Sequence, residues 1–324
     1  MATLSSLPNE LLILIFTLAA FDVRAGNITN TIGRTCKSFH NVVQASGIDV
    51  IFVSLRGIDN MQSFLGLLQA RKMNQKKVSS LLVVAEPGLH NDAAHNAHVA
   101  NVLENILCTI SPSHLQTLFV HFPIRSRYPS PLKFPLLPAL AEVHLFGLVI
   151  TPAEGEPPHL PNLKRLQLHH SGELPQEFQS LPRFLWSIAP QLTHVLLAFR
   201  VPIGSLMMKI FNDLTTFLIM LGPKSIRDDY IQMQLEDYPN EPAPTNPFPA
   251  SLRHIVLSFH RWEESRRTSL ILIDTLISGI ATLQKNEEMS LAVLPVREDG
   301  EEKELEEFRE DWKRVSEGLE ASWT

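Results

Sequence analysis

The sequence predicts an α/β fold in which a small amino-terminal helical module is followed by an irregular solenoid of short parallel strands and helices. Three observations predict it. A six-residue phrase of the form L-x-x-L-x-L, with other aliphatic residues allowed, recurs along the chain. Segments with the apolar spacing of helices lie between several copies. The copies begin only after the first 45 residues, which open with a strongly apolar helix.

The composition indicates a folded chain without a membrane span. Hydrophobic residues make up 44% of the 324 residues and charged residues only 19%, which is too little charge for disorder. The longest apolar stretch, Leu11 to Phe21, is shorter than the roughly 20 residues a spanning helix needs. Only Cys36 and Cys108 are present, so a reducing cytoplasmic or nuclear compartment is expected. Without a basic, aromatic-rich face, neither nucleic acid nor a membrane is an expected partner.

The amino-terminal module, residues 1–45, begins with a helix near Pro8, because proline suits the first helical position. Two further helical segments, Ile28 to Ile32 and Arg34 to Val43, would cover it. The apolar residues of the first helix occupy more than one face, so we expect its own domain on one side and a partner protein on the other. These residues are Leu11, Leu12, Leu14, Ile15, Phe16 and Leu18.

The module resembles the F-box family. The family pattern "LP.ELL..IF..L" is matched by Leu7, Pro8, Glu10, Leu11, Leu12, Ile15, Phe16 and Leu18. Its later "C+.W" element reads here Cys36-Lys37-Ser38-Phe39, with Phe39 in place of the usual Trp. The stretch between, residues 22–33, is longer and more polar than the usual second helix.

The resemblance implies a three-helix module that docks on the Skp-family adaptor of an SCF-type ubiquitin ligase, and through it on a cullin scaffold. The chain would then hold a protein substrate for ubiquitination and would itself be no enzyme. The residues assigned to partner binding on this basis are Leu7, Pro8, Leu11, Leu12, Ile15, Phe16, Cys36 and Phe39. The alternative is that the first helix is simply a buried structural helix.

The repeats occupy residues 46–297. The clearest copies start at Leu115, Leu140, Leu163, Leu192 and Leu252, which lie 25, 23, 29 and 60 residues apart. The first three steps fit or nearly fit one leucine-rich repeat of 20 to 29 residues, and the last would fit two, with a blurred copy Leu214-Phe217-Ile219 between them. Earlier copies start at Ile48 and Val78, and a final strand is expected at Ser290 to Leu294. The chain resembles irregular leucine-rich arrays. The alternative is a doubly wound α/β domain.

The segments that connect the expected strands are of two kinds, helical and proline-rich. Helical spacing predicts helices at Met61–Lys72, Ala93–Ile110, Phe178–Ile188, Leu206–Asp213 and Leu270–Leu283. Proline-rich returns, where extended loops are expected, lie at Pro123–Pro138, Pro152–Pro161 and Pro239–Pro249. Strand residues that alternate with the apolar positions should face solvent and form the substrate-binding face. They are Thr117, Phe119, Glu142, His144, Arg165, Gln167, His194 and Leu196.

The acidic segment 298–324 predicts an amphipathic helix whose apolar stripe includes Phe308 and Trp312. Because the ends of a solenoid must be covered, we expect this helix to cap the last repeat. A coiled coil with another chain is the alternative.

No catalytic motif is found, and no cofactor or metal is expected. His90, His95 and His98, with Asp92 near them, suit an ordinary polar surface better than a metal cluster. Besides the ligase adaptor, two functions stay open: a free-standing leucine-rich interaction protein, and an α/β enzyme with a degenerate motif.

Overall fold

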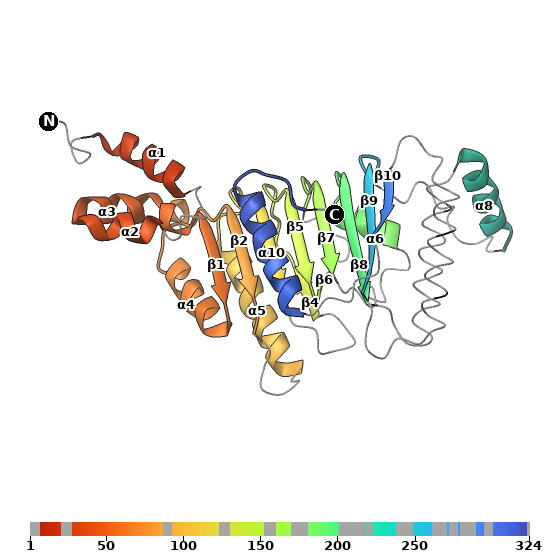
Figure 1. Cartoon of the computed structure of the whole chain (residues 1–324), viewed down its shortest axis with the longest axis horizontal. Coiled ribbons are helices and arrows are strands. Elements are labelled where there is room, and N and C mark those ends of the chain that lie inside the picture. Colours follow the sequence, from red (N-terminus) through yellow and green to blue (C-terminus); the bar gives the residue numbers. More distant parts are fainter. Residues whose placement is uncertain are drawn as a thin grey trace. The chain divides into compact units, whose positions relative to one another are not determined.

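The protein has a mixed α/β fold with a largely parallel sheet, as predicted (Figure 1). The computed structural model describes residues 7–20, 28–86, 93–122, 130–151, 160–169, 181–200, 219, 223–237, 249–260, 271, 278, 290–294 and 301–322. No helix in these segments is long and apolar enough to cross a membrane.

Helices within the described residues are α1 Asn9–Ala20, α2 Ile28–Thr35, α3 Lys37–Ser46, α4 Ile58–Gln69, α5 Ala93–Thr109, α6 Leu181–Ile188, α8 Lys224–Asp237 and α10 Glu301–Ser316, with short 3₁₀ turns at Ile48–Val50 and Met73–Gln75. The main sheet contains β1 Phe52–Arg56, β2 Ser80–Val84, β3 Thr117–His121, β5 Glu142–Phe146, β7 Arg165–His169, β8 His194–Arg200, β9 His254–His260 and β10 Ser290–Val293. A two-stranded parallel sheet pairs β4 Ser130–Lys133 with β6 Leu148–Thr151.

Strands of the main sheet follow one another in chain order, β1-β2-β3-β5-β7-β8-β9-β10. Every apolar position of the five clearest phrase copies is fully buried. The second and third positions of each copy alternate along a strand and therefore point to the same face, whereas the first position lies just before the strand. The blurred copy expected between β8 and β9 is wrong as a strand of this sheet. β8 pairs directly with β9 from His194 to Arg200, and Ile219 is helical, while Leu214 and Phe217 lie outside the described residues.

The strand starts repeat one another in their backbone hydrogen bonds. A four-residue turn, closed by an N–H to C=O bond of 3.0 to 3.2 Å, precedes four strands, at residues 137–140, 160–163, 189–192 and 249–252. Proline at the second position favours such turns in three of them. The carbonyl just before a strand then accepts two N–H groups from the start of the next strand, at 2.8 to 3.1 Å. The carbonyls that do so are those of Ile51, Ser79, Gln116, Lys164 and Thr193.

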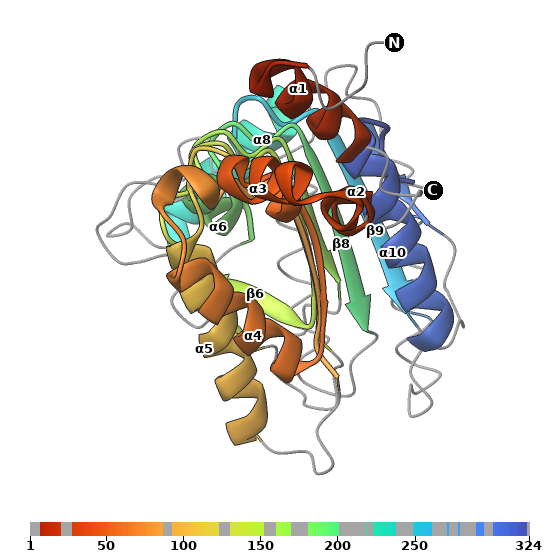
Figure 2. The same ribbon diagram turned by 90° about the vertical axis from the view of Figure 1, so that its left-hand side faces the viewer.

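The chain divides into two compact units. The first comprises Met1–Pro123, Phe134–Val143 and Asp299–Trp323, and the second comprises Ile124–Lys133, His144–Glu298 and Thr324. In the first unit, α4 and α5 lie on one face of the strands and α10 on the other (Figure 2). Every residue of β2 and β3 is therefore buried, whereas Ser54 and Arg56 of β1 are exposed.

The C-terminal helix lies in a different place from the one expected. α10 packs against β2 and β3, near the beginning of the strand order, and not on the last strand. The indole Nε1 of Trp312 donates to Ser80 Oγ at 2.8 Å, and the ring of Phe308 packs edge-on to Phe119 with centroids 5.1 Å apart. Apolar periodicity identified the stripe that is buried, but the strands that it covers are set by non-local packing.

The expected return helices are confirmed at α4, α5 and α6. The expected helix 206–213 lies outside the described residues, and of the helix expected at 270–283 only Ile271 and Ser278 are described, both helical. The proline-rich return 123–138 contains strand β4, so it is not entirely a loop. α8 was not expected from the spacing of apolar residues.

Candidate protein-interaction surface

Helix α1 begins just after Pro8, whose carbonyl accepts the N–H groups of Leu11 and Leu12, both at 3.1 Å. Proline has no N–H to leave unsatisfied at this end of a helix. The helix contains only one charged residue, Glu10, which lies in the first turn where a negative charge is favourable. Pro8 and Glu10 therefore lie at the start of α1, where their residue types favour a helix start.

The three helices share a small core. Leu12 and Phe16, one helical turn apart, are each only 2% exposed and pack with Val42, Val43 and Ile48. The rings of Phe16 and Phe39 meet edge to face with centroids 5.1 Å apart. One face of α1 is thus occupied by its own module.

The opposite side of α1 carries four large apolar side chains that the protein leaves exposed. Leu11, Leu14, Ile15 and Leu18 are 46%, 56%, 40% and 64% exposed. Their spacing of i, i+3, i+4 and i+7 places them on one helix face. We call this set the α1 stripe. Contiguous exposed apolar patches of this kind mark interaction sites.

The residues assigned to partner binding from the sequence divide into three groups. Leu11 and Ile15 belong to the α1 stripe, and Pro8 and Cys36 are also exposed. Leu7 and Phe39 are half-buried against the module core. Leu12 and Phe16 lie inside that core, so they hold the module together and cannot contact a partner; a sequence pattern does not distinguish the two faces of an all-apolar helix. Leu14 and Leu18, which helical spacing could have identified, join the exposed set.

Cys36 has a local structural role. Its sulfur accepts the N–H of Phe39 at 3.5 Å and caps α3, with backbone angles of φ −159° and ψ 159°. This contact satisfies one of the N–H groups that a helix start leaves without an intrahelical partner. The cap orients α3, whose Val42 and Val43 complete the core beneath α1.

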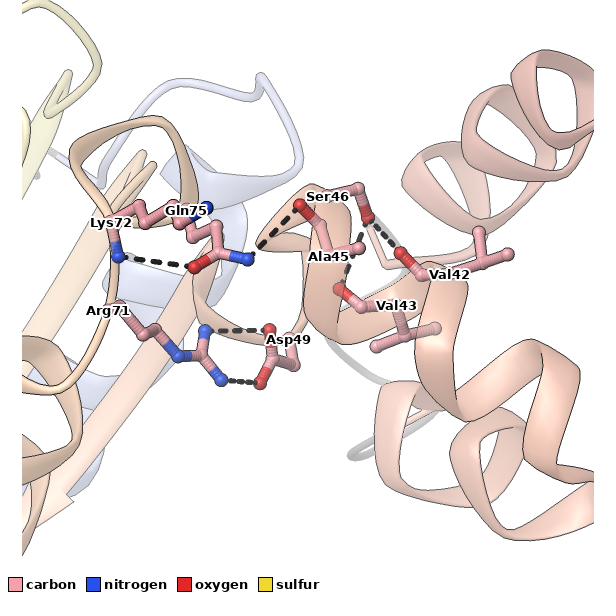
Figure 3. A network of polar contacts seen from close by, with 8 residues as sticks. All are labelled: Val42, Val43, Ala45, Ser46, Asp49, Arg71, Lys72 and Gln75. Carbon is pink, nitrogen blue, oxygen red and sulfur yellow. Dashed lines mark hydrogen bonds and ion pairs between the residues drawn. The ribbon is translucent and has the colours of Figure 1, made fainter.

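The module is joined to the start of the sheet by polar contacts (Figure 3). The guanidinium of Arg71, which follows α4, makes two contacts with the carboxylate of Asp49, one of them 2.9 Å long. Gln75 donates from Nε2 to the carbonyl of Ala45 at 3.5 Å. At Gly47, which ends α3 with φ 73°, a Cβ would lie 2.6 Å from the carbonyl oxygen of Gln75. These contacts hold the end of α3 and the turn after it against the segment that follows α4.

The expected substrate face is largely buried, which corrects the prediction of outward, solvent-facing side chains. Only Arg165 and His194 are partly exposed. In the first unit the reason is α10, which covers the face of β2 and β3 that carries Ser80 and Phe119. The buried members are Thr117, Phe119, Glu142, His144, Gln167 and Leu196.

Arg165 and His194 belong to a row of strand residues that also includes two residues not predicted from the sequence, His254 and Ser290. Strand register pairs Arg165 with His194, His194 with His254, and His254 with Ser290. All four are the first residues of their strands, and His254 and Ser290 are exposed. We call this set the strand-start row. The phrase copy at Leu252 already placed His254 at an outward position, so the same alternation could have found it.

The histidine cluster of the sequence does not come together as a site. Among the residues that the structure describes, no group of three His, Cys, Asp or Glu side chains is placed to hold a metal ion. The ring Nε2 of His98 lies 3.1 Å from the side-chain nitrogen of Gln62, and His95 is half-buried. His90 and Asp92 lie outside the described residues.

Comparison with protein-family models gave no match, and comparison with curated proteins gave none either.

Proposed function

We propose that this protein is a substrate-recognition adaptor of an SCF-type ubiquitin ligase. In this proposal α1–α3 form an F-box module that docks on a Skp-family adaptor through the α1 stripe. The strand array is an irregular leucine-rich solenoid that holds a protein substrate. The chain performs no catalysis of its own.

The observation that carries the proposal is the division of α1 into two apolar faces. Leu12 and Phe16 fill the module core, while the α1 stripe remains in water. Fully burying an exposed leucine or isoleucine side chain contributes about 1.5 to 3 kcal/mol. The four side chains of the α1 stripe are 40% to 64% exposed, so a partner that covers them would gain roughly half of that value from each. This is the segment on which the resemblance to the F-box family is most specific.

The solenoid part of the proposal is supported by the sequential strand order and by the recurring hydrogen bonds at the strand starts. A doubly wound sheet reverses its strand order at a switch point, where it binds its ligand. No such reversal occurs among the described strands. Stacked repeats in which each unit contacts its neighbours explain this order directly.

The test is direct binding of the purified full chain to a purified Skp-family adaptor. Leu14→Arg and Leu18→Arg place a charge on the most exposed positions of the α1 stripe without entering the core. We expect each to weaken binding at least about tenfold, since a buried unpaired charge costs more than 1.4 kcal/mol. Leu67→Arg on α4, a leucine 40% exposed in the same unit, is the matched control and should bind like the wild type.

Capture of the same variants from a lysate, with adaptor and cullin detected by mass spectrometry, extends the test to the assembled ligase. Equal adaptor binding by wild type, Leu14→Arg and Leu18→Arg would exclude the α1 stripe as the docking site. No adaptor binding by the wild type would favour the free-standing interaction protein, in which α1 covers the start of the array.

A further inference from the structure

We propose that the free protein pairs with a second copy of itself through the α1 stripe, and that this homodimer covers the stripe against other partners. The pairing is independent of the proposed function. Its consequence for the ligase, a competition between self-pairing and adaptor docking, rests on that function. The stripe consists of Leu11, Leu14, Ile15 and Leu18, which are 40% to 64% exposed.

The α1 stripe has the same spacing in both directions along the helix. From either end, its large apolar side chains recur at i, i+3, i+4 and i+7. An axis of twofold rotation that passes between Leu14 and Ile15 places these two residues opposite each other in an antiparallel pair of copies. The same rotation places Leu11 of one copy opposite Leu18 of the other. Leucine and isoleucine side chains are isomers, so each meets a side chain of its own size, and a twofold interface requires such self-complementarity.

Charge favours the antiparallel direction. Glu10 is the single charged residue of α1 and lies in its first turn. A parallel pair would bring the two Glu10 carboxylates together, whereas the antiparallel pair separates them by roughly 13 Å along the helix axis. It also sets the positive end of each helix dipole beside the negative end of the other. Because the stripe has no ionisable side chain, the second copy brings no charge that would be buried unpaired.

The other face of α1 fixes the orientation of the stripe. Leu12 and Phe16 are 2% exposed in the module core, and the ring of Phe16 packs edge-on to Phe39 with centroids 5.1 Å apart. A face that is held in place before pairing loses little conformational freedom when it pairs. Substitutions in the stripe can therefore change the pairing without opening the core.

The exposed area of the stripe determines how strong the pairing is. The four side chains together expose the equivalent of about two complete leucine side chains in each copy. A standard interface takes about 20 to 30 residues from each partner, and smaller ones belong to transient complexes. We therefore expect a dissociation constant on the order of 10 to 100 µM. Such a dimer covers the stripe in concentrated free protein and gives way to a partner that binds more tightly.

Sedimentation equilibrium of the purified full chain between about 5 and 500 µM tests the pairing. The wild type should change from monomer to dimer over this range. The dissociation constant should not rise between about 50 and 500 mM NaCl, because the interface contains no ion pair. Leu14→Arg and Leu18→Arg should each weaken pairing at least about a hundredfold, since a twofold interface carries every substitution twice. Leu67→Arg on α4, at 40% exposure, is the control and should pair like the wild type.

Two results of this experiment would overturn the proposal. One is a wild type that stays monomeric over the whole range. The other is a dimer that persists in folded Leu14→Arg and Leu18→Arg, because the contact would then lie elsewhere on the protein. Thermal unfolding of each variant checks that the fold is kept.

Disulfide cross-linking tests the direction of the pair by a second route. Leu11→Cys and Leu18→Cys are made in a Cys36→Ser, Cys108→Ser background, where serine can still cap α3. The two variants are oxidised separately and as a mixture. The antiparallel pair predicts cross-linked dimers in the mixture, because each cysteine of a single variant faces a leucine of its copy. Cross-linking of Leu11→Cys alone as efficient as that of the mixture would contradict the antiparallel arrangement.

Adding the purified Skp-family adaptor separates this inference from the proposed function. The cross-linked dimer should bind the adaptor only after reduction by dithiothreitol, and equal binding before and after reduction would overturn the competition. Dimerisation of a chain that fails to bind the adaptor would leave a second copy as the partner of the stripe and remove the ligase function. Adaptor binding by a chain that stays monomeric would remove the homodimer and leave the ligase function standing.

Discussion

Arg71 and Asp49 form a two-contact ion pair that joins the end of α4 to the 3₁₀ turn after α3. Their side chains are only 12% and 20% exposed, so the pair is sheltered from solvent. Through it the helical module and the first strand are held in one compact unit. Both residues belong to the part predicted as repeats, residues 46–297, and the donation from Gln75 Nε2 to the Ala45 carbonyl connects this part to the predicted module, residues 1–45.

The first prediction concerns this ion pair. Arg71→Met should lower the free energy of unfolding by about 2 kcal/mol, because it leaves the sheltered Asp49 carboxylate without its charged hydrogen-bond partner. The matched control is Arg56→Met, which breaks the exposed pair with Glu86 at 64% and 56% exposure and should change the stability by no more than about 0.5 kcal/mol. Urea unfolding of both variants measures the difference. Equal effects would mean that the Asp49 contact adds nothing beyond a surface pair.

The second prediction separates the two faces of α1. Phe16→Ala should lower the free energy of unfolding by about 3 to 5 kcal/mol, since Phe16 is 2% exposed within the module core. Leu18→Ala, on the α1 stripe at 64% exposure, should leave stability within about 0.5 kcal/mol of the wild type. Leu12→Asp should unfold the module, so lost adaptor binding in that variant would say nothing about the interface. A stability loss in Leu18→Ala as large as in Phe16→Ala would contradict the assignment of faces.

The third prediction tests the packing of the C-terminal helix α10 against β2 and β3. Trp312→Ala should lower stability by about 3 to 5 kcal/mol through lost packing. Trp312→Phe keeps a ring but removes the N–H that Ser80 accepts, and should cost about 1 kcal/mol. Leu319→Ala, at an exposed position after α10, is the control and should behave like the wild type. Differential scanning calorimetry gives all three values. If Trp312→Ala left the stability unchanged, the packing of α10 would not contribute to the stability of the first unit.

The fourth prediction concerns the close approach of the Gly47 backbone to the backbone of Gln75. Gly47 and Gly318 have similar positive φ angles of 73° and 80°, a conformation that costs other residues about 1 kcal/mol. A Cβ at Gly47 would meet the backbone of Gln75 at 2.6 Å, whereas a Cβ at Gly318 would meet nothing within 4 Å. Gly47→Ala should therefore destabilise the protein by about 2 kcal/mol more than Gly318→Ala in chemical unfolding. Equal losses would show that the turn can move away from Gln75.

The fifth prediction concerns thiol reactivity. Partial desolvation by burial, and secondly the carboxylate of Glu104, raise the pKa of the Cys108 thiol. A raised pKa lowers the thiolate fraction at pH 8, and the thiolate is the nucleophile. In a Cys36→Ser background, Cys108 should react with iodoacetamide more slowly at pH 8 than a model cysteine peptide, and the gap should narrow as the pH rises. A rate equal to that of the peptide would contradict the shift.

The sequence by itself determined the mixed α/β class and the start of most strands. The reason is local: the alternating half of the phrase selects strand residues, so Leu118, Leu166, Val195 and their equivalents are fully buried as expected. It also determined that α1 has more apolar surface than its own module can cover, because seven large apolar side chains in so short a helix exceed one face.

Only the tertiary structure decided which residues lie on which side. Leu12 faces the module core, whereas Leu14 is exposed. α10 packs on β2 and β3 and not on the last strand, where the sequence predicts it to lie. Most of the expected substrate face is buried. The tertiary structure also aligned Arg165, His194, His254 and Ser290 from four separate strands. Periodicity specifies that an element has an apolar face, but what covers that face depends on contacts between residues far apart in the chain, such as Trp312 with Ser80.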